Sequence, residues 1–168
     1  MIPLKDENPT KNFPLITIML IVSNTLIFLY QVSQPMETIR TFSTFGLIPV
    51  HLIESPISTY PTIYSSMFLH SGIAHLAGNM LYLWIFGNNI EDVLGKFRFI
   101  IFYLVCGTLA SVGHILTDLQ SDVPMVGASG AISGILGAYL ILFPFARVKT
   151  LVFLGFLTNS IFSNKTSP

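Results

Sequence analysis

The chain has 168 residues, of which 52% are hydrophobic and only 10% are charged. A soluble domain carries about 25% charged residues, so this composition argues against a soluble globular protein and indicates a membrane protein. The eight Lys and Arg residues balance the eight Asp and Glu residues, so the net charge gives no support for nucleic-acid binding. The single cysteine, Cys106, excludes a disulfide framework and thiolate metal clusters.

Apolar runs bounded by charges or prolines mark the expected spanning helices, because crossing a bilayer core takes about 20 mostly apolar residues. The first run follows lysines, but no small-residue cleavage site follows it, so we interpret it as an uncleaved span and not as a signal peptide. The four clear spans are expected at about 13–30, 65–88, 99–116 and 125–143, and a short fifth at 150–162.

The connection between the first two spans, residues 34–62, contains four prolines and no run long enough to cross a bilayer. Its apolar patches favour amphipathic structure at the membrane interface. The sequence therefore predicts an all-α polytopic membrane protein. Its parts are a cytoplasmic N-terminal tail at 1–12, a membrane core at 13–163 and a polar tail at 164–168.

The positions of the basic residues predict the orientation, since cytoplasmic loops carry an excess of Lys and Arg. Six of the eight fall on one side of the expected membrane, before the first span, between the second and third, and after the fourth. We therefore expect a multi-pass protein of the cell membrane with a cytoplasmic N-terminus. The 34–62 connection and the loop at 118–124 then face the exterior.

A serine among small residues opens the fourth expected span. Ser129 lies between Gly127 and Gly130 at the expected first turn of the helix. The free N–H groups and the dipole of a helix N-terminus stabilise developing negative charge, and flanking glycines let a substrate carbonyl approach the backbone. Ser129 is therefore a candidate nucleophile. The alternative is that these glycines, with Gly134 and Gly137, serve close helix packing.

Two polar side chains lie on one face of the second expected span. His75 and Asn79 are four residues apart, about 6 Å from each other, and mark either a functional site or an interhelical hydrogen bond. Counted along the spans, His75 lies about 15 Å and Ser129 about 6 Å below the outer boundary. If the loop before Ser129 dips inward, the three residues form an acyl-transfer centre in which His75 and Asn79 stabilise the oxyanion.

A serine nucleophile also needs a base that takes up its proton. By depth the best candidate is His114, near the outer end of the third span, although a histidine at an interface more often only makes hydrogen bonds. Zinc would need three or four closely spaced ligands, and the chain has no HExxH motif, no cysteine cluster and no carboxylate within the spans. We therefore expect no metal and no other cofactor.

Several of these motifs occur together in a characteristic order. They are Met67-Phe68-Leu69-His70, His75, Asn79, Gly87, Glu91 and the run VGASGAIS at 126–133. This pattern resembles the rhomboid family of intramembrane serine proteases, over about residues 13–157. By this resemblance, Ser129 matches the nucleophile, and His75 and Asn79 match the oxyanion-stabilising side chains. His70, Gly127 and Gly130 match supporting positions, and the 34–62 connection matches the membrane-embedded first loop.

The resemblance implies a rhomboid-like helical bundle that cleaves transmembrane protein substrates near the outer membrane face. Its partners would be those substrates and the lipid bilayer, with no nucleic acid and no metal. The family's base is a histidine in a sixth span whose small residues pack against the serine helix, and the 168 residues contain no such span. We therefore expect a core that is incomplete at its C-terminus, with the glycine face of the fourth span left uncovered. The alternative function is a catalytically inactive rhomboid-like protein, or fragment, that binds membrane helices.

Overall fold

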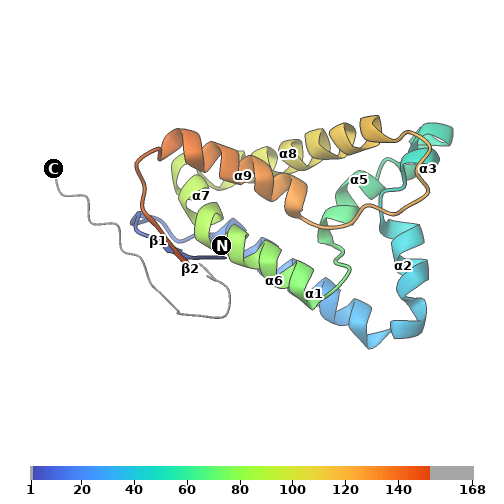
Figure 1. The fold of residues 1–168 in the computed structure, drawn as a ribbon, viewed down its shortest axis with the longest axis horizontal. Helices are drawn as coiled ribbons and strands as arrows, with labels where there is room; N and C mark the ends of the chain where they lie inside the picture. The colour runs from blue at the N-terminus through green and yellow to red at the C-terminus, as the bar shows by residue number, and fades with distance from the viewer. Residues whose placement is uncertain (1, 152–168) are drawn as a thin grey trace, which may run out of the picture.

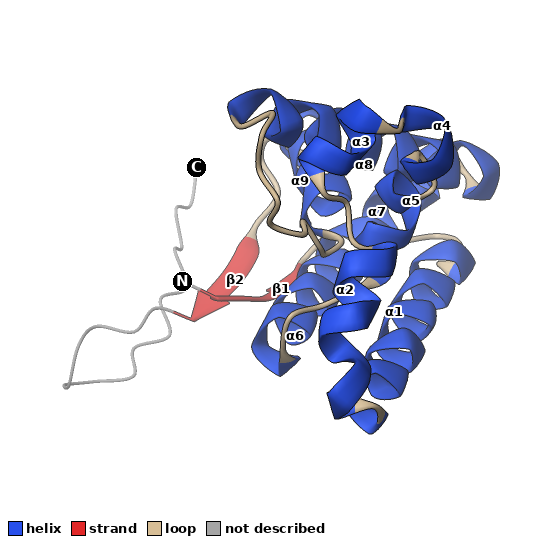
Figure 2. Ribbon diagram, turned by 90° about the vertical axis from the view of Figure 1, so that its right-hand side faces the viewer, coloured by secondary structure: helices blue, strands red, loops and turns tan. Residues whose placement is uncertain are grey.

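The computed structural model describes residues 2–151 and is built almost entirely of helices (Figure 1). Figure 2 shows that two short strands are the exception. In chain order the elements are β1 (Ile2–Asp6), α1 (Leu15–Ser33), the 3-10 turn η1 (Pro35–Glu37), α2 (Thr38–Phe45), α3 (Pro49–Glu54), α4 (Pro56–Thr59), α5 (Thr62–Ser65), the 3-10 turn η2 (Ser66–Phe68), α6 (Ile73–Tyr82), the π-helical turn η3 (Leu83–Gly87), α7 (Asn88–Leu94), α8 (Lys96–Thr117), α9 (Ser129–Leu142) and β2 (Val148–Leu151).

The predicted all-α class is confirmed, and the four expected spans correspond to α1, α6 to α7, α8 and α9. Within the described residues, α1 and α8 alone are single helices long and apolar enough to cross a membrane. The second expected span is helical throughout 73–94 but passes through the π-helical turn, and α9 has 14 residues. The short fifth run lies outside the described residues except for its first two, which belong to β2.

Two of the spans begin later than their apolar runs. The second begins at Ile73 and not near residue 65, because the preceding segment forms α5, η2 and an extended turn. The fourth begins at Ser129 and not near residue 125, because Met125 pairs with Leu47 in an isolated β-bridge and Gly127 has a φ of +118°. Apolarity marks what is buried or lipid-facing, and the backbone conformation determines where each helix starts.

The strand pair was not predicted. β1 and β2 pair in antiparallel fashion, with Lys5 opposite Lys149, at the end of the bundle away from α2 and α3 (Figure 1). Asp6 of β1 is buried and accepts hydrogen bonds from Asn89 Nδ2 at 2.8 Å and from the Tyr139 hydroxyl at 3.3 Å. Part of the expected N-terminal tail is therefore a strand held against α7 and α9.

A buried carboxylate joins the start of α1 to α7. Glu91 is 3% exposed and accepts hydrogen bonds from the backbone N–H groups of Ile16 and Thr17, at 2.9 and 2.8 Å, and from the Thr17 hydroxyl. The residue before the helix is Pro14, which offers no side-chain cap. Glu91 thus satisfies N–H groups that a helix N-terminus leaves free.

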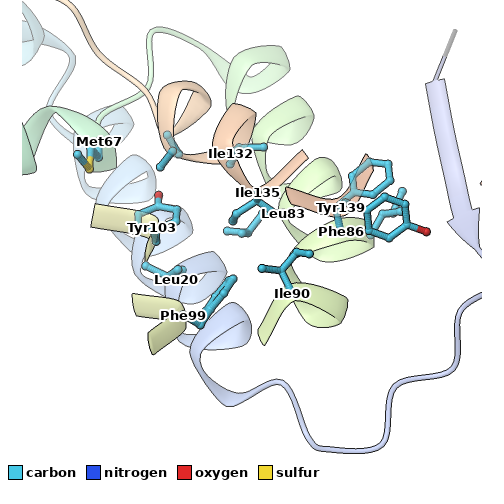
Figure 3. Packing of buried hydrophobic residues seen from close by; sticks show 13 residues of the cluster. Leu20, Met67, Leu83, Phe86, Ile90, Phe99, Tyr103, Ile132, Ile135 and Tyr139 are labelled. Atoms are coloured by element: carbon cyan, nitrogen blue, oxygen red, sulfur yellow. The ribbon is translucent and has the colours of Figure 1, made fainter. Parts of the chain in front are cut away.

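The core lies where α1, α8 and α9 meet η3 and α7 (Figure 3). Leu83, Ile90, Phe99, Tyr103 and Ile135 are completely buried there. Large apolar side chains also cover the outside of α1, α8 and α9, where they face the lipid of a membrane protein.

Small residues allow α8 and α9 to pack closely. A Cβ atom at Gly130 would lie 2.6 Å from the Ala110 Cβ atom, and one at Gly134 would collide with the Cys106 side chain. The expectation that the glycine face of α9 is left uncovered is therefore wrong for these two positions, because α8 occupies them. A Cβ atom at Gly137 would meet no atom within 4 Å among the described residues.

Candidate active site

Ser129 is the first residue of α9, and its side chain is exposed. Within the described residues its hydroxyl has no hydrogen-bond partner, whereas the Ser133 hydroxyl one turn later donates to the Ser129 carbonyl at 2.8 Å. The loop before Ser129 is held from two sides. The Gly127 N–H donates to the Ser66 carbonyl at 2.8 Å, and the Met125 N–H donates to the Leu47 carbonyl at 2.8 Å.

Gly127 brings this loop against the second span. A Cβ atom there would lie 2.6 Å from His75 Nε2 and 3.6 Å from Asn79 Nδ2. Its φ of +118° is also one that residues with a side chain rarely adopt. Glycine at 127 therefore allows the backbone just before Ser129 to lie beside both polar side chains.

His75 and Asn79 lie one turn apart on α6. Since α6 begins at Ile73, His75 lies about 3 Å along its helix at a rise of about 1.5 Å per residue. The expected depth of His75 assumed a helix that begins near residue 65, and that helix start is wrong. His75 Nδ1 lies 3.1 Å from the Ser71 hydroxyl, while its Nε2 edge faces Gly127.

His70 lies behind this pair and fixes Asn79. Its ring is buried, its Nε2 atom lies 3.0 Å from Asn79 Nδ2, and the His70 and His75 rings pack edge to face with centroids 5.1 Å apart. A carboxamide nitrogen can only donate, so His70 Nε2 accepts and the ring proton lies on Nδ1.

Gln31, in the last turn of α1, holds the backbone of His70. Its Oε1 atom accepts from the His70 N–H at 3.2 Å, and its Nε2 atom donates to the His70 carbonyl at 3.3 Å. The sequence analysis missed both Gln31 and Ser71. Gln31 had one signal, since it is a polar residue at the end of an apolar run.

Ser129, His75 and Asn79 all line one cavity of about 350 Å³ between α6 and α9. Its walls also include Ala74 and Gly78 of α6, and a Cβ atom at Gly78 would meet no atom within 4 Å among the described residues. We call this cavity the α6–α9 groove. A second cavity of about 200 Å³, lined by Met67, Gly107, Ala110 and Ser111 among others, reaches Ser129 from the α8 side.

The described residues place no imidazole within hydrogen-bond distance of the Ser129 hydroxyl. His114, the expected candidate by depth, is exposed on α8 and lines neither of the two cavities at Ser129. Gly130 contacts Ala110, so its missing side chain serves the packing of α9 on α8. These residues place a serine at a helix N-terminus together with an imidazole and a carboxamide along one cavity.

The comparisons with known proteins agree on one family. The Rhomboid domain model matches residues 58–164. Rhomboid protease GluP of Bacillus subtilis (strain 168) is 36% identical over 115 residues, which are 68% of this chain and 22% of that protein. Rhomboid protein 1, mitochondrial, of Saccharomyces cerevisiae (strain ATCC 204508 / S288c) is 36% identical over 118 residues, which are 68% of this chain and 33% of that protein.

Presenilin-associated rhomboid-like protein, mitochondrial, of Homo sapiens is 31% identical over 144 residues, which are 83% of this chain and 35% of that protein. The matched segments thus span 22% to 35% of the lengths of these three relatives. The family model covers more than half of the chain. This chain belongs to the rhomboid family, whose members are integral membrane proteins.

Proposed function

We propose that this protein is an intramembrane serine endopeptidase that cleaves transmembrane protein substrates with Ser129 as nucleophile. The observation that supports the proposal most is that Ser129, His75 and Asn79 line the same α6–α9 groove. Relatives named rhomboid proteases support the same reaction class. No metal or other cofactor takes part, since the chemistry needs a nucleophile, an oxyanion site and a base.

We assign the oxyanion donors from the polar contacts around the site. His75 Nδ1 lies 3.1 Å from the Ser71 hydroxyl, and with that hydroxyl donating to Nδ1 the ring proton is on Nε2, facing Gly127. One N–H of Asn79 is used by His70, and the other is free to donate. As the Ser129 oxygen bonds to the substrate carbonyl carbon, the carbonyl electrons move to its oxygen, which then accepts from His75 and Asn79.

The remaining step is proton transfer. The base takes the Ser129 proton, gives it to the leaving amine as the peptide bond breaks, and activates the water that hydrolyses the acyl ester. We assign the base to a histidine on a helix that docks in the α6–α9 groove, because that groove opens beside Ser129 between small residues of both walls. Cleavage occurs near the outer face of the membrane, with the N-terminus in the cytoplasm and the protein in the cell membrane.

A second function is favoured by one specific observation, the lack of an imidazole bonded to Ser129 among the described residues. In that case the protein binds membrane helices in the α6–α9 groove and does not cleave them. The two functions differ in one measurable property, the reactivity of Ser129.

The test uses a serine-directed fluorophosphonate and a transmembrane model substrate. The purified protein is assayed alone and extended at its C-terminus by a spanning helix that carries a histidine among small residues. We expect Ser129→Ala to abolish labelling and cleavage. Ser133→Ala is the matched control, because Ser133 is also exposed on α9 but donates its hydroxyl to the backbone, and it should remain active. Loss in both variants contradicts the assignment, and substrate binding without labelling or cleavage supports the second function.

A further inference from the structure

A cavity of about 680 Å³ lies between the last turns of α1, helix α2 and the α5–η2 turn. In Figure 1, α2 lies beside the end of α1, and α5 lies on the same side of α2 as α1. The cavity shares no lining residue with the α6–α9 groove. Gln31 forms part of its wall, but the Gln31 amide already binds the His70 backbone.

The rim of this cavity carries one charge of each sign. Arg40 and Glu37 both line it, and the Arg40 Nη1 atom lies 3.5 Å from the Glu37 Oε2 atom. The two side chains are 81% and 52% exposed, and an ion pair that exposed contributes little stability. The pair can therefore open at little cost, so that each of the two side chains binds a charged group of a ligand. Together they complement a ligand with an anionic and a cationic group a few ångströms apart.

The surroundings of the cavity are apolar and lie where a membrane interface is expected. Tyr30, in the last turn of the spanning helix α1, is 66% exposed, and Phe45 of α2 is 52% exposed. Met36 and Ile39, at the start of this segment, are 94% and 85% exposed. Helix α2 has no buried residue. Amphipathic helices of this kind lie in the plane of the interface with their apolar side chains among the acyl chains.

We propose that this cavity binds the headgroup of a phospholipid with a primary ammonium group, namely a phosphatidylethanolamine. The phosphate accepts hydrogen bonds from the Arg40 guanidinium, and the ammonium group donates to the Glu37 carboxylate. An acyl chain follows the apolar wall of Ile27 and Phe68, which also line the cavity. A choline headgroup would have no N–H to give to Glu37, and phosphatidylglycerol would bring no cation to it.

The test measures lipid retained by the full chain in detergent, by native mass spectrometry after addition of dioleoyl-phosphatidylethanolamine, -phosphatidylcholine or -phosphatidylglycerol. We expect phosphatidylethanolamine to bind best. Arg40→Gln should weaken its binding about tenfold or more, because a hydrogen bond to a charged group is lost. Glu37→Gln should remove the preference over phosphatidylglycerol, since Arg40 then acts as an isolated cation.

Arg98→Gln is the matched control, because Arg98 is an exposed arginine in the first turn of α8, outside the cavity lining. It should leave retention and preference unchanged. Thermal unfolding of each variant shows whether it is folded. Equal retention by the wild type, Arg40→Gln and Glu37→Gln, or equal binding of phosphatidylglycerol and phosphatidylethanolamine by the wild type, would overturn the proposal.

Discussion

At the scale of single residues, Gly127 lets the serine loop lie against α6. We predict that Gly127→Ala lowers cleavage strongly and destabilises the protein, because the methyl group would meet His75 Nε2 at 2.6 Å and the backbone φ is +118°. Such backbone strain costs about 1–3 kcal/mol. Gly72→Ala is the control, since its φ is 178° and its Cβ atom would meet nothing within 4 Å among the described residues. Cleavage by the chain extended with the histidine-bearing helix, and unfolding in detergent, are the measurements. Equal effects at the two positions would refute the role of the contact.

The roles of Asn79 and His70 can be distinguished by the kinetics of their variants. In the chain extended with the histidine-bearing helix, Asn79→Ala should lower turnover about ten- to a thousandfold, as is typical when one oxyanion donor is lost, with little change in the amount of inserted protein. His70→Phe removes the acceptor that orients Asn79, so kcat should fall while KM stays close to its original value. His70→Gln restores an acceptor oxygen and should recover part of kcat. Loss of inserted protein in Asn79→Ala would instead identify the pair as a structural clasp.

At the scale of elements, the N-terminus of α1 depends on a carboxylate from α7. We predict that Glu91→Ala destabilises the protein by about 1–3 kcal/mol, because it leaves two backbone N–H groups and a hydroxyl without their acceptor. Glu91→Gln keeps one acceptor oxygen and should cost less. Glu54→Ala, at an exposed position of α3, is the control and should change the free energy of unfolding by less than about 0.5 kcal/mol. A similar cost at both positions would contradict the capping role.

Part of the arrangement of elements and of the site could be predicted from the sequence. The apolar runs identified the helical segments, and the spacing of His75 and Asn79 placed them on one face, because both follow from local periodicity. The start of α6 at Ile73 was not predictable, since the short turns before it contain an apolar stretch, Met67-Phe68-Leu69, that composition alone does not separate from the helix. The pairing of β1 with β2 joins segments more than 140 residues apart and has no local signal. The partner of Gln31 could not be predicted either, because His70 is 39 residues away in the sequence.

At the scale of the whole molecule, the positions of the basic residues predict the orientation. Six of the eight fall on one side, and the pairing of β1 with β2 shows that the start of the chain and the segment after α9 share a side. We predict that a cysteine in the 118–124 loop reacts with an impermeant thiol reagent added to intact cells, and that one replacing Lys96 does not. The background is Cys106→Ala, and labelling after lysis shows that both sites are reactive. The opposite pattern would reverse the assigned orientation.

The last prediction concerns the α6–α9 groove and the base. A general base contributes about 10² to 10⁴ in rate, so the 168-residue chain should cleave a transmembrane substrate slowly or not at all unless a histidine reaches Ser129. A histidine-bearing helix appended at the C-terminus should restore cleavage by docking between α6 and α9. Gly78→Leu should block this gain, because it fills the groove wall at a position where a Cβ atom now meets no atom within 4 Å.

Gly113→Leu is the matched control for Gly78→Leu, since a Cβ atom at Gly113 also meets nothing within 4 Å among the described residues but Gly113 lies on α8, outside the groove.

The rival base is His114. If His114 serves, the chain without the appended helix cleaves the substrate, and both Ser129→Ala and His114→Ala abolish that cleavage. That result would remove the need for a docked helix. Cleavage that requires the appended helix, and that Gly78→Leu abolishes but Gly113→Leu does not, would place the base in the groove. The leucine at 78 excludes only a group that approaches from that side.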